Sequence, residues 1–64
     1  MNQYRIIIID ESRSEWAKPF VLMDKCVNGI KEARSASPIK FSWSRNAKRF
    51  TGYDGDLFVL VERL

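Results

Sequence analysis

The sequence predicts an α+β fold in which one helix packs on a mostly antiparallel four-stranded sheet, in the element order ββαββ. Two runs of consecutive apolar residues, at 6–9 and 57–61, predict strands near the two ends of the chain. Between them, apolar residues spaced by three and four predict one helix, at about residues 25–36. A chain of 64 residues has room for one small domain, so residues 1–64 are expected to form a single unit.

The first half of the chain is expected to form two strands. Residues 6–9 are four consecutive isoleucines, and β-branched side chains pack well on a pleated surface but lose rotamer freedom in a helix. Residues 10–14 form a polar turn, and apolar residues return at 16–23. Because Pro19 has no backbone N–H to donate, the second strand is expected to be an edge strand or to begin after the proline.

The central segment contains the pair Asn28-Gly29, which is a strong hairpin signal. A hairpin needs alternating apolar residues on both sides, and adjacent charges at 24–25 interrupt that alternation. The helix is therefore favoured, with Asp24 as its N-cap and an end before Pro38, while the hairpin is kept as the alternative. The expected apolar face of this helix contains Met23, Cys26, Val27, Ile30 and Ala33.

The second half of the chain is expected to form the other two strands. Residues 39–44 alternate between apolar and polar side chains, which is typical of a half-buried strand that reaches as far as Phe50. Within this strand Trp43 is expected to be a core side chain. Residues 51–56 are rich in turn formers, and residues 57–61 form a last strand that is apolar on both faces.

One helix can cover only one face of a four-stranded sheet, yet the first and last strands are apolar on both faces. The uncovered face would hold either Ile6 and Ile8 or Ile7 and Ile9, together with alternate residues of 57–61. Such a patch indicates a contact with a partner or a homodimer. The alternative is that these two strands are central and that loops, Trp16 or Tyr53 close over them.

The charges are unevenly distributed along the chain. Residues 1–32 carry five basic and five acidic side chains, whereas residues 33–53 carry five basic side chains and no acidic one. With Lys31, this predicts a basic partner-binding face, and the alternative is a solvated surface. Phe50 and Tyr53 are candidates for stacking on bases. The predicted partner-binding residues are Lys31, Arg34, Lys40, Arg45, Lys48 and Arg49.

Catalysis and metal binding are not expected. The chain has no histidine and one cysteine, so the commonest general base and the usual zinc ligand sets are missing. Cys26 is expected to be a buried core thiol. No phosphate-binding glycine motif occurs, and no enzyme activity, cofactor or metal is predicted. A single thiol and the lack of a long apolar run or secretory signal favour a cytoplasmic protein without a membrane contact.

These observations favour a small non-enzymatic interaction protein that docks a basic face, residues 31–53, on an acidic protein or a nucleoprotein complex. One alternative is a nucleic-acid-binding protein in which Arg45, Lys48 and Arg49 contact phosphates. A second alternative is an oligomerising structural subunit that uses the apolar sheet face. In size and expected element order the chain resembles the small proteins that phages encode to inhibit host machinery, including some anti-CRISPR proteins. The resemblance covers no motif; it implies an inhibitory role and assigns no residues.

Overall fold

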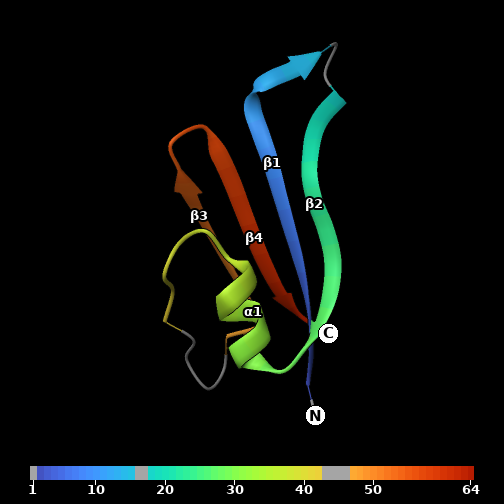
Figure 1. Cartoon of the computed structure of the whole chain (residues 1–64), viewed down its shortest axis with the longest axis vertical. Coiled ribbons are helices and arrows are strands. Elements are labelled where there is room, and N and C mark those ends of the chain that lie inside the picture. The colour runs from blue at the N-terminus through green and yellow to red at the C-terminus, as the bar shows by residue number, and fades with distance from the viewer. Residues whose placement is uncertain (1, 16–17, 43–46) are drawn as a thin grey trace.

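Four antiparallel strands form one sheet, and a single short helix lies against it (Figure 1). The computed structural model describes residues 2–15, 18–42 and 47–64. Along the chain the elements are β1 (Gln3–Glu15), β2 (Lys18–Asn28), α1 (Ile30–Ala36), β3 (Arg49–Asp54) and β4 (Leu57–Arg63). The strand order is β2-β1-β4-β3, which confirms the predicted α+β class and the ββαββ sequence of elements.

The two apolar strands, β1 and β4, occupy the centre of the sheet. Their register pairs Ile6 with Val61 and Ile8 with Val59, so these four side chains share one face. Because successive side chains of a strand point to opposite faces, Ile7 and Ile9 lie on the other face. Central strands that are apolar on both sides explain the unbroken apolar runs in the sequence.

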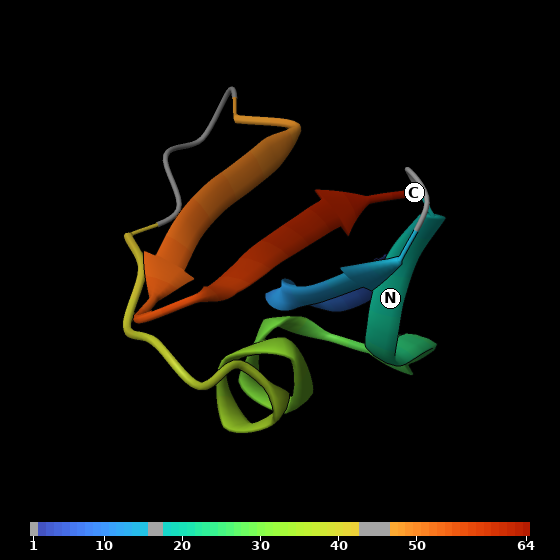
Figure 2. The same cartoon turned by 90° about the horizontal axis from the view of Figure 1, so that it is seen from above.

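We call the side of the sheet that carries α1 the helix face (Figure 2). Its core is formed by Tyr4, Ile6, Ile8, Ala33, Val59 and Val61, all of them buried. The helix contacts β1 and β2, while the segment that follows it packs Ile39 and Phe41 against the same core. Ile39 lies over Gly52 of β3. A Cβ atom added to Gly52 would come within 2.6 Å of the Cδ1 atom of Ile39. Gly52 thus makes room for Ile39 beside the edge strand.

The prediction that a helix starts near residue 25 is wrong, because β2 continues to Asn28 and α1 begins at Ile30. The pair Asn28-Gly29 is neither a hairpin nor the middle of a helix; it is the junction between the two elements. Gly29 has φ 85° and ψ 157°, a region that is accessible almost only to glycine. Asp24 is no N-cap, since it lies in β2 opposite Ile7. The predicted end before Pro38 agrees with the structure.

The third strand was also predicted in the wrong place. Residues 39–42 form no strand, and Trp43 lies outside the described residues. The strand is instead Arg49–Asp54, most of which was expected to be a turn, and the turn itself contains only Gly55 and Asp56. Gly52 and Tyr53 adopt a strand because the complete ladder with β4 pairs them with Val59 and Phe58.

The β1–β2 hairpin extends beyond the ends of the other two strands (Figure 1). Phe20, Val21 and Leu22 of this arm are 42%, 49% and 50% exposed. The register shifts between the pairs Ile8–Met23 and Ile9–Val21, so Leu22 is the extra residue of a β-bulge. The edge strand therefore carries a short exposed apolar run and an irregular ladder. Within the described part of the chain, no helix has the length and apolar character needed to cross a membrane.

Candidate functional site

Two of the predicted basic residues, Arg34 and Lys40, line one hollow at the C-terminal end of α1. Its other lining residues are Ser37, Pro38, Ile39 and Phe41, and its volume is about 500 Å³. We call these six residues the basic hollow; none of them is acidic. The Ser37 hydroxyl donates to the carbonyl oxygen of Ile39 at 2.7 Å and accepts from the Ile39 N–H at 3.3 Å. These bonds tie the turn around Pro38 and hold Arg34 and Lys40 on either side of it.

Lys40 also borders a second, shallower hollow, which is lined by Phe41, Ser42 and Phe50 as well. The rings of Phe41 and Phe50 stack on each other, with centroids 5.0 Å apart and planes inclined by 29°. Phe50 lies on the helix face because it pairs with the buried Val61. Its ring is therefore half-buried against Phe41, and the predicted stacking on a base would have to use its remaining surface.

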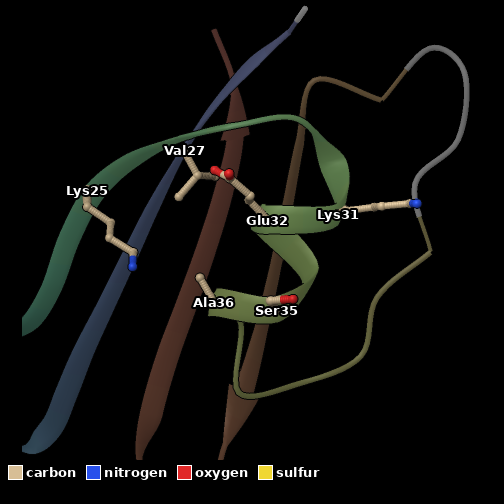
Figure 3. A pocket seen from close by; sticks show the side chains of 6 residues that line it. All are labelled: Lys25, Val27, Lys31, Glu32, Ser35 and Ala36. Atoms are coloured by element: carbon tan, nitrogen blue, oxygen red, sulfur yellow. The ribbon is translucent and has the colours of Figure 1, made fainter.

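Lys31 lies apart from the basic hollow. Together with Lys25, Val27 and Glu32 it borders a separate hollow between β2 and α1, and its side chain points away from Lys25 (Figure 3). The Glu32 carboxylate accepts a hydrogen bond from the backbone N–H of Asn28 at 3.0 Å, which fixes the start of the helix. This hollow therefore contains an acidic side chain, unlike the basic hollow.

The remaining predicted residues do not join the same surface. Arg49 pairs with Glu62, and Tyr53 pairs with Phe58, so both lie on the face opposite α1. Lys48 is exposed just before β3, where its carbonyl oxygen accepts the N–H of Arg63 at 2.8 Å. Arg45 lies outside the described residues. The structure thus brings Arg34 and Lys40 together and separates them from Arg49 and Tyr53.

We call the side of the sheet opposite α1 the open face, because no other described element packs on it. The register places apolar side chains on it in transverse rows. One row contains Val21, Ile9, Phe58 and Tyr53 in the order of the strands, and the next contains Ile7 and Leu60 between Asp24 and Thr51. The sequence indicated such a patch with two alternative sets of isoleucines, and the structure selects Ile7 and Ile9.

Charged side chains border the apolar rows of the open face at the end near the chain termini. Arg5 donates two hydrogen bonds to Asp24, from Nε to Oδ1 at 2.9 Å and from Nη2 to Oδ2 at 2.8 Å. These bonds raise the pKa of Arg5 and lower the pKa of Asp24 below its ordinary value. Glu62 stands opposite Arg5 on one side and Arg49 on the other. Sequence reasoning missed this cluster, because its members are far apart along the chain.

The hairpin end of the open face carries a second polar contact. The Glu11 carboxylate accepts a hydrogen bond from the Tyr53 hydroxyl, and this bond raises the pKa of Tyr53 above its ordinary value. The Tyr53 ring lies edge-on to Phe58, with centroids 5.4 Å apart. Tyr53 is nevertheless 61% exposed, so its ring presents a broad amphipathic surface on this side of the sheet.

The structure corrects one further prediction: Cys26 is exposed. It pairs with Arg5 in the β1–β2 ladder and so lies on the open face instead of in the core. Among the described residues, no group of three or more cysteine, aspartate or glutamate side chains is placed to hold a metal ion. Comparisons with models of protein families, with curated proteins and with solved structures find no match to this chain.

Proposed function

We propose that this chain is a small non-enzymatic interaction protein that docks its basic hollow on an acidic surface of a partner protein. The observation that carries the proposal is the placement of Arg34 and Lys40 around a hollow of about 500 Å³. The lining of this hollow combines three apolar residues, Pro38, Ile39 and Phe41, with the two cations. A segment that combines a carboxylate with an apolar side chain would match both features.

The two cations would have different roles in such a contact. The planar guanidinium of Arg34 can bind a carboxylate through two parallel hydrogen bonds, whereas the ammonium of Lys40 acts as a point charge. Long-range attraction between these two cations and an acidic partner would raise the association rate. The apolar lining would then contribute through the burial of Ile39 and Phe41.

Direct binding of nucleic acid is the alternative, and the arrangement of the aromatic residues supports it less well. Phe50 has one side of its ring against Phe41, and Tyr53 lies on the opposite face of the sheet. A single strand could not use both rings and the basic hollow on one surface. We therefore favour an acidic polypeptide over a nucleic acid as the ligand.

Docking on a partner is itself enough for an inhibitory role, since a bound module can block the partner's own binding surface. The inhibitor of the type that phages encode remains part of this proposal and rests on the size and element order of the chain. A cytoplasmic location belongs to the same proposal. The exposed thiol of Cys26 supports it, because an unpaired exposed cysteine persists best in a reducing compartment.

The test is a fluorescence anisotropy titration with two kinds of probe: labelled poly-L-glutamate, and short single- and double-stranded DNA and RNA. Each is measured at about 50 and about 200 mM salt, the range in which phosphate-driven binding changes most. The test variant carries Arg34→Glu and Lys40→Glu. The matched control carries Lys18→Glu and Lys25→Glu, which change the net charge equally on β2, outside the basic hollow.

The proposal predicts that the wild type and the control variant bind poly-L-glutamate, while the test variant binds it at least about tenfold more weakly, because two attractions become repulsions. Equal binding by the two variants would show that only the net charge matters and would contradict the role of the basic hollow. Tighter binding to DNA or RNA than to poly-L-glutamate, with a steep salt dependence, would favour the nucleic-acid alternative.

A further inference from the structure

The open face is unusually apolar for a sheet surface in contact with water. An antiparallel sheet with one solvated face normally alternates apolar residues inside with polar residues outside. Here the central strands place Ile7, Ile9, Phe58 and Leu60 on the outer side, and Tyr53 extends the patch onto an edge strand. In a domain of 64 residues, apolar side chains that are left outside the core lose stabilisation that the small core needs. This pattern indicates a face that another molecule covers.

We propose that the occupant is a second copy of this chain, bound face to face around a two-fold axis that runs parallel to the strands between β1 and β4. Such an axis reverses the lateral order of the strands, so that β1 lies over β4 of the second copy and β2 over its β3. The same axis leaves the position of each transverse row along the strands unchanged, so each row lies over the same row of the second copy. An interface of this kind uses the same patch on both chains and requires that patch to complement itself.

The charges of the open face meet this requirement. Across the strand order β2-β1-β4-β3 they alternate in sign: Asp24 is negative, Arg5 positive, Glu62 negative and Arg49 positive. Reversing the order places Glu62 over Arg5 of the second copy, and it places the strand that carries Asp24 over the strand that carries Arg49. Arg5 then faces Glu62 of the second copy, and Arg49 lies diagonally across from Asp24 of the second copy, two residue pairs along the ladder.

The apolar rows of the open face also complement themselves. In the same arrangement Ile7 faces Leu60 of the second copy, Ile9 faces Phe58, and Val21 faces Tyr53. A two-fold axis perpendicular to the strands would instead turn the charged end of one face onto the apolar end of the other. That arrangement would bury charges against aliphatic side chains, which is costly. The distribution of side chains therefore favours the axis parallel to the strands.

Pairing through the exposed edge of β2 is a weaker alternative for self-association. The β-bulge at Leu22 interrupts the regular ladder, and Pro19 has no backbone N–H to donate to a neighbouring strand. Both features are typical of edge strands that avoid pairing with another chain. The open face has no comparable protection.

The size of the open face is adequate for a stable contact. A standard interface buries about 800 Å² on each partner, which is about one sixth of the 4878 Å² that this chain exposes. The chain is 37 Å long and 19 Å across, so one side of it offers a surface of this order. Stacked sheets lie about 10 Å apart with strands inclined by about 30°, which lets the apolar rows interdigitate.

The test uses charge reversal at the two edges of the sheet, Asp24→Lys and Arg49→Glu. Asp24 lies on β2 and Arg49 on β3, with two strands between them, so neither change can restore the other within one chain. Native mass spectrometry measures self-association of the wild type, of each variant alone and of an equimolar mixture of the two variants. Far-ultraviolet circular dichroism confirms that each variant is folded. Lys40→Glu, in the basic hollow, is the control for a charge change elsewhere.

The proposal predicts that the wild type and Lys40→Glu form dimers and that each edge variant alone dimerises at least about tenfold more weakly, because like charges then lie diagonally across the interface from each other. In the mixture, heterodimers of the two variants recover, since the introduced lysine meets the introduced glutamate. A wild type that stays monomeric, or edge variants that dimerise like the wild type, would overturn the proposal. This outcome is independent of poly-L-glutamate binding, which reports on the other side of the molecule.

Discussion

The two central strands carry aliphatic side chains on both faces of the sheet, and the two faces differ in environment. On the helix face, Ile6, Val59 and Val61 have no exposed surface, because α1 and the segment 37–42 pack over them. On the open face, Ile7 and Leu60 are only half-buried, and no other described element lies against them. Neighbouring residues of the same strand thus have a complete apolar environment on one side and an incomplete one on the other.

This difference shows that the described part of this short chain completes the core on only one face of the sheet. One helix of seven residues cannot cover both sides of four strands. The central strands are nevertheless apolar on both sides, so the face on which no described element packs keeps partly exposed apolar side chains. The basic hollow adds a second, chemically different surface beside the helix.

The largest expected effect separates the two faces directly. Ile6→Ala removes a fully buried side chain and should lower the free energy of unfolding by about 2–5 kcal/mol. Ile7→Ala, its neighbour on the open face, should lower it by less than about 1.5 kcal/mol in the monomer, since the side chain is already partly exposed to water. Urea denaturation at a dilute protein concentration measures both. Equal losses would mean that the two faces are equally covered.

A smaller loss of stability is expected from a change at Gly29, in the junction between β2 and α1. Gly29→Ala should destabilise the fold by about 1–3 kcal/mol, because φ 85° with ψ 157° is accessible almost only to glycine. Gly55→Asn is the matched control: its φ of 60° is left-handed, which asparagine tolerates, and nothing lies within 4 Å of an added Cβ. Thermal unfolding of both variants checks this, and a tolerated Gly29→Ala would argue against a fixed junction.

The Arg5–Asp24 pair of the open face should make a pH-dependent contribution. The pKa of Asp24 is lowered in the folded chain from its ordinary value of 3.8, so the pair stabilises the fold above that pH and its contribution disappears as the pH falls through the lower folded value. Asp24→Asn should therefore reduce stability at about pH 7 and make no difference in strong acid. The effect is small, since both side chains are exposed. Urea denaturation at both pH values measures it.

The smallest effect concerns Tyr53. Its pKa is raised from the ordinary value of 10.0 by the hydrogen bond to Glu11, so this contact stabilises the fold below that pH and is lost as the pH rises through the folded value. Glu11→Gln should return the pKa of Tyr53 towards 10.0. Ultraviolet absorbance titration measures the ionisation, and Tyr53→Phe identifies the signal. An unchanged titration in Glu11→Gln would contradict the contact.

Sequence patterns predicted the two central strands and the end of the helix better than the beginning of the helix and the third strand. Met23 and Val27 are four residues apart, a spacing that falls on one face of a strand as well as of a helix, so the pattern favoured a helix where β2 continues. The positive φ of Gly29 separates β2 from α1. The spacing of the apolar residues does not report this backbone conformation. Gly52 and Tyr53 were assigned to a turn because their strand depends on pairing with β4, which local propensity does not report.

The arrangement of the candidate binding residues was predicted less completely for a similar reason. A run of basic residues along the chain does not stay on one face once part of it is a strand, so Arg49 and Phe50 point to opposite sides. Among the described residues of that run, only Arg34 and Lys40 come together in the basic hollow. The alternating charges of the open face come from four different strands. The pairing of the strands sets their order across the sheet, and the sequence alone does not show that pairing.

The most direct test of the division between the two faces is sedimentation equilibrium of the wild type and of Leu60→Lys over a range of concentrations. Leu60 lies on the open face outside the core, so the variant should remain folded. We expect the wild type to reach twice the chain mass of 7.5 kDa and the variant to stay at the mass of one chain. A wild type that sediments as a single chain at every concentration would contradict self-association through the open face.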